Sequence, residues 1–94
     1  MARTAIVLLK YVVPLERILQ STDAHRAYLR ELNAQGKLLT SGPFEPRTGG
    51  CLIFRVEDEA ELHALLAKDP FHKEGLVEDD IRFWAPNIGA LAPA

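Results

Sequence analysis

Two residues that lie far apart in the chain, His25 and Asp69, have side chains that could exchange protons with a substrate as a pair. Histidine takes up and releases protons near neutral pH, and a carboxylate bonded to one ring nitrogen fixes the tautomer and the orientation of the imidazole. On local pattern alone each residue has a structural alternative. His25 also fits a half-buried structural histidine, and Asp69, which precedes Pro70, also fits a turn-forming aspartate.

A second set of residues offers contacts for a ligand rather than a reacting group. Ser41, Gly42 and Pro43 follow an apolar segment, where glycine would let a ligand approach the backbone and serine would add a hydroxyl group. The same tripeptide also fits the plain end of a strand, and no Gly-x-Ser-x-Gly motif makes the serine a nucleophile. Phe71 and His72, in the loop after the second predicted helix, are candidates for lining the pocket, and a solvated loop surface is the alternative for His72.

The composition excludes several classes of partner. The chain has 94 residues and a formal net charge of -2, and its 11 basic residues are scattered, so no electrostatic footprint for a nucleic acid exists. No apolar stretch approaches the ~20 residues that span a bilayer, so we expect no membrane partner. The three histidines form no close pair with a cysteine, so no metal site is predicted, and the acid–base scheme needs no organic cofactor.

Cys51 is the only cysteine in the chain. A single cysteine excludes an intrachain disulfide, and its position in an apolar segment fits a buried thiol in a reducing compartment. Lys10 interrupts the apolar N-terminal stretch, and no small-residue cleavage site follows, so this stretch is predicted to be a strand rather than a signal peptide. We therefore expect a soluble, cytoplasmic protein with a single domain over residues 1–94.

The helix that carries His25 is predicted over residues 22–35. Residues 21–23 are all types that favour helix N-caps, and Gly36 supplies the left-handed conformation that ends many helices. The spacing i, i+3, i+4, i+7 defines one face of this helix, made up of His25, Tyr28, Leu29 and Leu32. His25 is thus expected in the first helical turn, on the side that faces the sheet.

The remaining elements alternate in type along the chain. Branched and aromatic residues predict strands at residues 4–13, 37–44, 51–56 and 77–85. Asp58 and Glu61 have the spacing of a capping box and predict a second helix that Pro70 cannot continue, and residues 69–75 then form a tight connection. This order predicts an α+β fold, the ferredoxin-like split βαβ arrangement (βαββαβ), in which a four-stranded antiparallel sheet has two helices on one face.

The other face of that sheet has no cover from the chain itself. In the first strand Ile6 and Leu8 point one way while Val7 and Leu9 point the other, so both faces carry apolar side chains. We expect the uncovered face to pack against a second copy and form a dimeric α+β barrel, a homodimer that takes a small-molecule substrate or ligand. Residues 86–94 have no periodic pattern and are predicted to be a flexible or partner-contacting tail.

Three stretches combine these features in a distinctive order: His25 to Leu29, Gly36 to Pro43, and Asp69-Pro70-Phe71 followed by Gly75 and Leu76. Together they resemble the YCII-related family over nearly the whole chain. The resemblance implies a ferredoxin-like homodimer with its sheets face to face and a pocket that contains a His–Asp pair. The family's histidine corresponds to His25, the aspartate of its Asp-Pro-aromatic motif to Asp69, and its Ser/Ala-Gly-Pro strand end to residues 41–43. The loop at 45–50 is shorter than in some members, which bears on substrate size.

The resemblance also implies a function. The family is similar to enzymes that act on breakdown products of chlorinated aromatics by proton transfer and elimination. The leading hypothesis is therefore a small enzyme of lyase, isomerase or dehalogenating type, without a cofactor, in which His25 is the general acid or base and Asp69 orients its imidazole. The alternatives are a non-catalytic homodimer that binds a ligand or partner with the same pocket, and a cofactor-free monooxygenase that only fold-level analogy supports.

Overall fold

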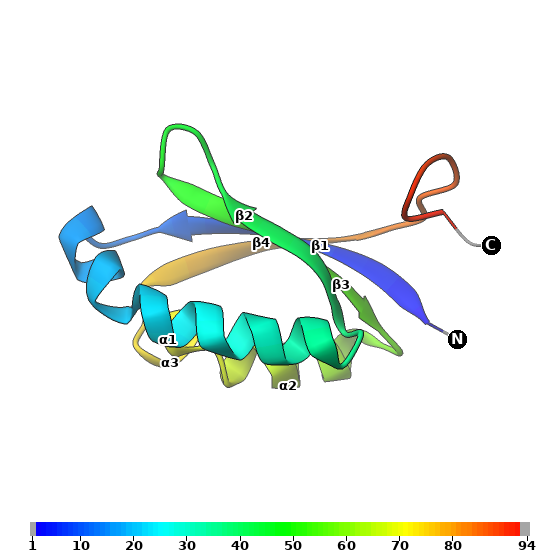
Figure 1. Ribbon diagram of the computed structural model, residues 1–94, viewed down its shortest axis with the longest axis horizontal. Coiled ribbons are helices and arrows are strands. Elements are labelled where there is room, and N and C mark those ends of the chain that lie inside the picture. Colours follow the sequence, from blue (N-terminus) through cyan, green and yellow to red (C-terminus); the bar gives the residue numbers. More distant parts are fainter. Residues whose placement is uncertain (1, 93–94) are drawn as a thin grey trace.

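The structure, a computed structural model, describes residues 2–92 as one four-stranded sheet with all of its helices on one side (Figure 1). Along the chain the elements are β1 (Arg3–Tyr11), α1 (Leu15–Ala34), β2 (Leu38–Pro43), β3 (Gly49–Val56), α2 (Glu59–Ala67), α3 (Pro70–Lys73) and β4 (Val77–Trp84). The strands lie in the order β2-β3-β1-β4, and every pair of neighbours is antiparallel. The predicted α+β, ferredoxin-like fold is confirmed, and the short helix α3 is added to the two expected helices.

The side chains of the central strand β1 alternate between the two faces of the sheet. Ala5, Val7 and Leu9 are buried beneath the helices, whereas Ile6 and Leu8 point to the uncovered face and are half-buried. The boundaries of all four strands lie within two residues of the predicted ones. Branched apolar residues were therefore a reliable signal for β1, β3 and β4, each of which packs one face against the core.

Helix α1 begins seven residues earlier than predicted, at Leu15 instead of residue 22. Pro14 takes the N-cap position, and its carbonyl accepts hydrogen bonds from the amides of Arg17 and Ile18. Ile18 is fully buried and extends the inner face of the helix toward its start. The prediction was wrong because it required a polar side chain as the cap, whereas here proline precedes the helix and no side chain caps it.

The polar residues that were predicted as N-caps lie inside α1 and have other partners. Ser21 Oγ donates to a carboxylate oxygen of Glu74 at 2.9 Å, which ties α1 to the end of α3. Thr22 Oγ1 donates to the Ile18 carbonyl at 2.8 Å, within the helix. As a result His25 lies nearly three turns into the helix, not in its first turn.

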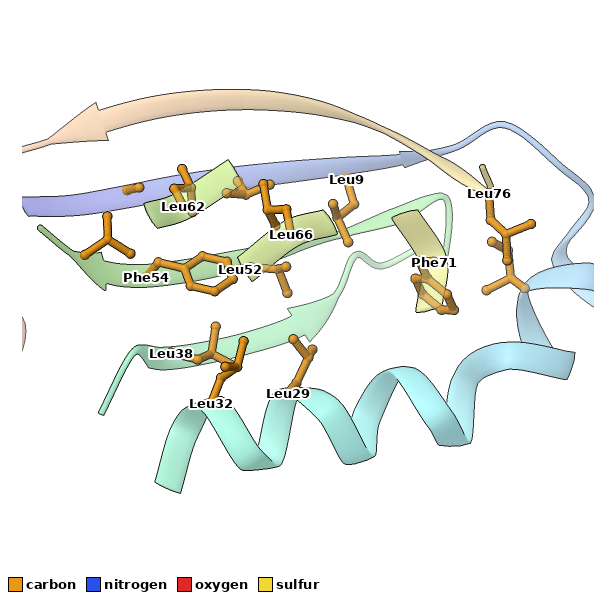
Figure 2. Packing of buried hydrophobic residues seen from close by; sticks show 14 residues of the cluster. Leu9, Leu29, Leu32, Leu38, Leu52, Phe54, Leu62, Leu66, Phe71 and Leu76 are labelled. Atoms are coloured by element: carbon orange, nitrogen blue, oxygen red, sulfur yellow. The ribbon is translucent and has the colours of Figure 1, made fainter. Parts of the chain in front are cut away.

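The core fills the space between the sheet and the helices (Figure 2). Within residues 2–92 it is one cluster of buried apolar side chains: Ala5, Val7, Leu9, Ile18, Leu29, Leu32, Leu38, Leu52, Phe54, Val56, Leu62, Leu66, Phe71 and Leu76. Leu29 and Leu32 place the same face of α1 that carries His25 against the sheet. Full burial of one leucine side chain contributes about 1.5–3 kcal/mol, so this cluster sets the rotation of α1 about its axis.

Strands β2 and β3 form the predicted hairpin, and two glycines let its backbone come close to neighbouring strands. A Cβ atom at Gly49 would lie 1.8 Å from the carbonyl oxygen of Leu9, and one at Gly50 would lie 2.9 Å from that of Gly42. Both glycines were expected in the turn, but they pair with β1 and belong to β3. The remaining loop carries Arg47 back over α1, where it contacts Thr22.

The segment between α2 and β4 only partly matches the prediction. Asp58 caps α2 as expected, since its side chain accepts a hydrogen bond from the amide of Glu61 at 2.8 Å. The predicted tight connection at 69–75 instead contains α3, with Asp69 at the N-cap position and Pro70 in the first turn. Proline suits that place because the amide it lacks would have no partner inside the helix.

The uncovered face of the sheet is apolar at its centre. Ile6 pairs with Ile53 and Leu8 pairs with Cys51, and these four side chains are half-buried although no helix covers them. Trp84 lies on the same face with 44% of its surface exposed. Residue 1 of the predicted domain lies outside the described residues, and so do residues 93–94 at the end of the predicted tail. Within residues 2–92, no helix is both long and apolar enough to cross a membrane.

Candidate active site

His25 and Asp69 meet where α1 packs against α3. The distance between Nδ1 of His25 and Oδ1 of Asp69 is 2.5 Å, and only 8% and 1% of the two residues' surface is exposed. Helix α1 turns the imidazole inward because His25 shares the buried face with Leu29 and Leu32. The structure therefore brings together two residues whose separation the sequence left open.

Asp69 is also bonded to a second histidine. Its other oxygen, Oδ2, lies 2.5 Å from Nδ1 of His72, and Nε2 of His72 lies 2.7 and 2.9 Å from the two carboxylate oxygens of Asp79 on β4. Ionised carboxylates only accept hydrogen bonds, so His72 satisfies both only when each of its ring nitrogens carries a proton. The result is a chain of four side chains, from His25 through Asp69 and His72 to Asp79, that joins α1, α3 and β4.

The charges along this chain follow from burial and hydrogen bonding. Burial disfavours the imidazolium of His72, but the carboxylates of Asp69 and Asp79 outweigh burial and raise the pKa of His72 from 6.5 to about 9. Burial would likewise raise the pKa of Asp69, but hydrogen bonds from His25 and His72 outweigh it and hold that pKa below its ordinary value. Near neutral pH, Asp69 is thus a carboxylate and His72 is an imidazolium.

Phe71 fixes the plane of the His25 ring. The two rings are stacked, with centroids 3.8 Å apart and planes 6° from parallel. Tyr11 contacts Phe71 edge-on, with centroids 6.2 Å apart and an angle of 86°. Stacking restricts rotation of the imidazole, and the electron-rich face of an aromatic ring also attracts a positive charge placed over it. Asp69 and Phe71 together hold the imidazole in one orientation.

A cavity of about 370 Å³ opens beside His25. Of the residues predicted to bind substrate, four line this cavity together with His25: Ser41, Gly42, Pro43 and Phe71. Gly42 has open space around its Cβ position. The lining includes neither Asp69 nor His72, and both ring nitrogens of His72 are bonded to carboxylates instead.

The second ring nitrogen of His25 is available to the cavity. Nδ1 is bonded to a carboxylate and carries a hydrogen atom, which leaves a lone pair on Nε2 of the neutral ring. Among residues 2–92, Nε2 has no hydrogen-bond partner in the protein. Every buried side-chain nitrogen or oxygen there has such a partner, so Nε2 is not fully buried. Since His25 lines the cavity, Nε2 is the nitrogen that a ligand in the cavity could reach. An acceptor nitrogen that faces a cavity and is backed by a carboxylate can act as a general base.

Several polar residues of the lining were not predicted: Tyr11, Thr22, Arg26, Arg30, Asn33 and Arg47. Four of them follow one another on α1 at intervals of three or four residues, from Thr22 to Asn33. This spacing places them in a row beside His25, so the helical pattern could have identified them. Arg47 has no comparable signal, because it lies in an irregular loop and only the fold brings it to the cavity.

The four hydrogen-bonded side chains from His25 to Asp79 do not form a metal site. Among residues 2–92, no group of histidine, cysteine, aspartate and glutamate side chains is arranged to hold a metal ion. The oxygens of Asp69 are instead taken by the two imidazoles. That the protein works without a cofactor stays a prediction.

Comparisons with known proteins address the fold and the family. A family model described as the YCII-related domain matches residues 4–83. No curated protein matches the sequence significantly. Among solved structures, the chain is similar to 5-chloro-2-hydroxyhydroquinone dehydrochlorinase from Burkholderia phenoliruptrix AC1100 in complex with 2,5-dihydroxybenzoquinone. The TM-score is 0.76 at 28% sequence identity, and the match covers 86% of this chain and 92% of that chain.

Proposed function

The chain belongs to the YCII-related family, and on this premise we propose that it is a small enzyme that transfers protons on a small cyclic or aromatic organic substrate. His25 acts as the general acid or base, and Asp69 orients its imidazole. The observation that carries this proposal is the 2.5 Å contact between His25 Nδ1 and Asp69 Oδ1 beside a cavity. A purely structural histidine would be expected in closed apolar surroundings, bonded to backbone.

The proposed chemistry starts at Nε2 of His25. This nitrogen takes a proton from a ring hydroxyl group or from a carbon beside a carbonyl, and Asp69 stabilises the imidazolium that results. In an isomerisation, the same proton returns to another atom of the substrate. In an elimination, a leaving group departs with its bonding electron pair, so a chlorinated ring loses one proton and one chloride ion, which together are HCl. Neither reaction needs an oxidant or a reductant.

The solved dehydrochlorinase supports an enzymatic role and points to the substrates to test first. A cavity of about 370 Å³ lies near the lower end of the roughly 300–1,000 Å³ found for small-molecule sites, so it suits a compound with a single ring. A panel of halogenated hydroquinones, phenols and lactones therefore covers the proposed class, with 5-chloro-2-hydroxyhydroquinone as its first member.

The test is turnover of this panel by the wild-type protein and by His25→Gln. Release of chloride and the change in ultraviolet absorption measure the reaction. Because a positioned acid or base contributes roughly 10²–10⁴-fold, His25→Gln is expected to lower kcat by that factor while circular dichroism shows a folded protein. Asp69→Asn should also lower kcat, since an amide cannot hold the imidazolium as a carboxylate does.

His63→Gln is the matched control for His25→Gln, because His63 is exposed on α2 and its ring bonds only to Glu59 among residues 2–92. Turnover that is unchanged in a folded His25→Gln variant would refute the role of His25. If no member of the panel is turned over but one of them stabilises the protein against heat, the non-catalytic binding protein is the better description.

We also propose that the chain works as a single domain in a cytoplasmic homodimer. The half-buried centre of the uncovered sheet face, Ile6 with Ile53 and Leu8 with Cys51, supports a second copy as its partner. The free thiol of Cys51 supports a reducing compartment. A tail that contacts the partner subunit belongs to the same proposal.

A further inference from the structure

The cavity beside His25 is lined by cations and by no anion. Arg26, Arg30 and Arg47 contribute to its lining, which contains no aspartate and no glutamate. Among the described residues, none of these three guanidinium groups takes part in a salt bridge. Arginine keeps its charge at every pH of interest. Positive charge that no neighbouring carboxylate compensates attracts an anionic ligand and raises its local concentration.

Arg47 is the arginine that the protein holds in place. It is half-buried, its Nε donates to the hydroxyl oxygen of Tyr11 at 3.3 Å, and its Nη2 donates to Oγ1 of Thr22 at 3.4 Å. Both acceptors are neutral, so the contacts position the guanidinium and leave its charge intact. An arginine has five N–H donors in a fixed fork that matches a carboxylate, and three of them stay available here.

Two sets of contacts place Arg47 and His25 at the same part of the cavity. Thr22, which Arg47 contacts, lies three residues before His25 on α1, so the two side chains are neighbours on one helical face. Tyr11, the other contact of Arg47, packs edge-on against Phe71, which is stacked on the His25 ring. A single small ligand can therefore reach both the guanidinium of Arg47 and Nε2 of His25.

The rest of the lining is suited to a hydrocarbon ring. Four buried leucines contribute to it: Leu9, Leu29, Leu38 and Leu52. Apolar walls that surround a few convergent polar groups are typical of sites for organic molecules. Free phosphate would satisfy the arginines but leave these leucines without an apolar contact, so the lining favours an anion that carries a ring.

We propose that this cavity selects a small cyclic organic anion, such as a ring carboxylate or phenolate, and that Arg47 binds its negatively charged group while the ring lies within reach of His25. The inference rests on the proposed function, since it describes the substrate class of the same site. Arg47 is thus a substrate-binding residue that fixes which part of the ring faces Nε2.

Isothermal titration calorimetry with salicylate, salicylamide and inorganic phosphate tests this inference. Salicylate and salicylamide have nearly the same shape, but only salicylate is an anion near neutral pH. In low salt, the wild-type protein is expected to bind salicylate at least ~10-fold more tightly than either of the other two, because a charge-assisted hydrogen bond is about twice as strong as a neutral one. Equal affinity for salicylate and salicylamide, or no binding of either at millimolar concentration, would overturn the proposal.

Arg47→Gln assigns the preference to one side chain. It is expected to weaken the binding of salicylate roughly 10- to 100-fold and to leave the affinity for salicylamide unchanged. Arg47→Lys should keep part of the preference for salicylate. Lys68→Gln is the matched control, because it removes one positive charge from an exposed residue outside the cavity. A preference that Arg47→Gln retains overturns the assignment. If Arg47→Gln does not fold, the test is made on the wild-type protein, where added salt must weaken the binding of salicylate but not that of salicylamide.

These measurements are independent of turnover. A preference for salicylate that depends on Arg47 would stand even if no member of the panel were turned over, in which case the site binds anions without acting on them. Conversely, a large loss of turnover in His25→Gln without any preference for the anion would leave the proposed function in place and overturn only the inference about charge.

Discussion

Asp69 is shared by two imidazoles that differ in what they can do. His72 is bonded to carboxylates through both ring nitrogens and stays an imidazolium near neutral pH, whereas His25 has one nitrogen free to reach a substrate. His72 does not line the cavity, so it can act on His25 only through Asp69. It holds that carboxylate ionised and in place, which makes it a positioning residue in the proposed reaction.

Asp79→Asn tests the charge on His72. Because the pKa of His72 is raised from 6.5 to about 9, the folded protein keeps a proton that the unfolded chain releases. The associated stabilisation, at most roughly 3 kcal/mol, is complete below pH 6.5 and is lost as the pH rises through 9. Asp79→Asn should lower the free energy of unfolding by roughly 1–3 kcal/mol near pH 6 and by much less near pH 9.5. Urea denaturation across this range measures the difference.

Asp80→Asn is the control for that experiment. Asp80 follows Asp79 on β4 but points to the uncovered face, where it is exposed and its carboxylate pairs only with Arg82 within the described part of the chain. Its substitution should change stability little at any pH. If wild type and Asp79→Asn gave parallel curves of stability against pH, His72 would not be the group that titrates.

At single residues, the sequence indicated candidate side chains more readily than it indicated their contacts. His25 and Asp69 were identified because their residue types and the family resemblance agree. The pairing of Asp69 with His72 follows from a spacing of three residues in one helical turn, so it was within reach once a helix was assigned there. The roles of Asp79 and Arg47 could not be predicted, because each residue reaches the site from another element and no local sequence pattern encodes that approach.

Among the elements, β3 of the β2–β3 hairpin contains Gly49, the described glycine at which an added Cβ atom would come nearest to another atom. A Cβ atom at Gly49 would lie 1.8 Å from the Leu9 carbonyl oxygen, which is backbone and cannot move aside alone. Gly49→Ala is therefore expected to destabilise the protein by about 3 kcal/mol or more. Gly42→Ala, in the paired strand, meets nothing within 4 Å and should cost less than about 1 kcal/mol. Thermal unfolding of both variants gives the comparison, and equal losses would contradict the packing argument.

The elements themselves were largely predictable, with one instructive exception. The strands and α2 carry local signals that agree with their packing, such as the Asp58 cap. The first two turns of α1 do not, since Leu15 and Leu19 are exposed while Ser21 and Thr22 are buried. Ser21 and Thr22 find polar partners inside the fold, so polarity in this stretch reports hydrogen bonding rather than exposure.

For the whole molecule, the uncovered sheet face leads to a prediction about assembly. Ile53 lies at its apolar centre opposite Ile6, so a glutamate there would place a charge in the proposed interface. Wild type is expected to elute as a dimer in size-exclusion chromatography with light scattering, and Ile53→Glu as a folded monomer. Ala64→Glu, on the exposed side of α2, should stay dimeric. A monomeric wild type at micromolar concentration would refute the dimer.

The junction at Asp69 has a consequence for how such proteins change over evolutionary time. Its carboxylate joins α1, α3 and, through His72, β4, so replacing it would disturb the packing of these elements as well as the proposed chemistry. A lineage without the proposed activity would therefore still be selected to keep Asp69. The exposed arginines that line the cavity, Arg26 and Arg30, are under no such double constraint. Sequence differences at those positions, rather than loss of the His–Asp pair, are therefore expected to accompany a change in the proposed substrate.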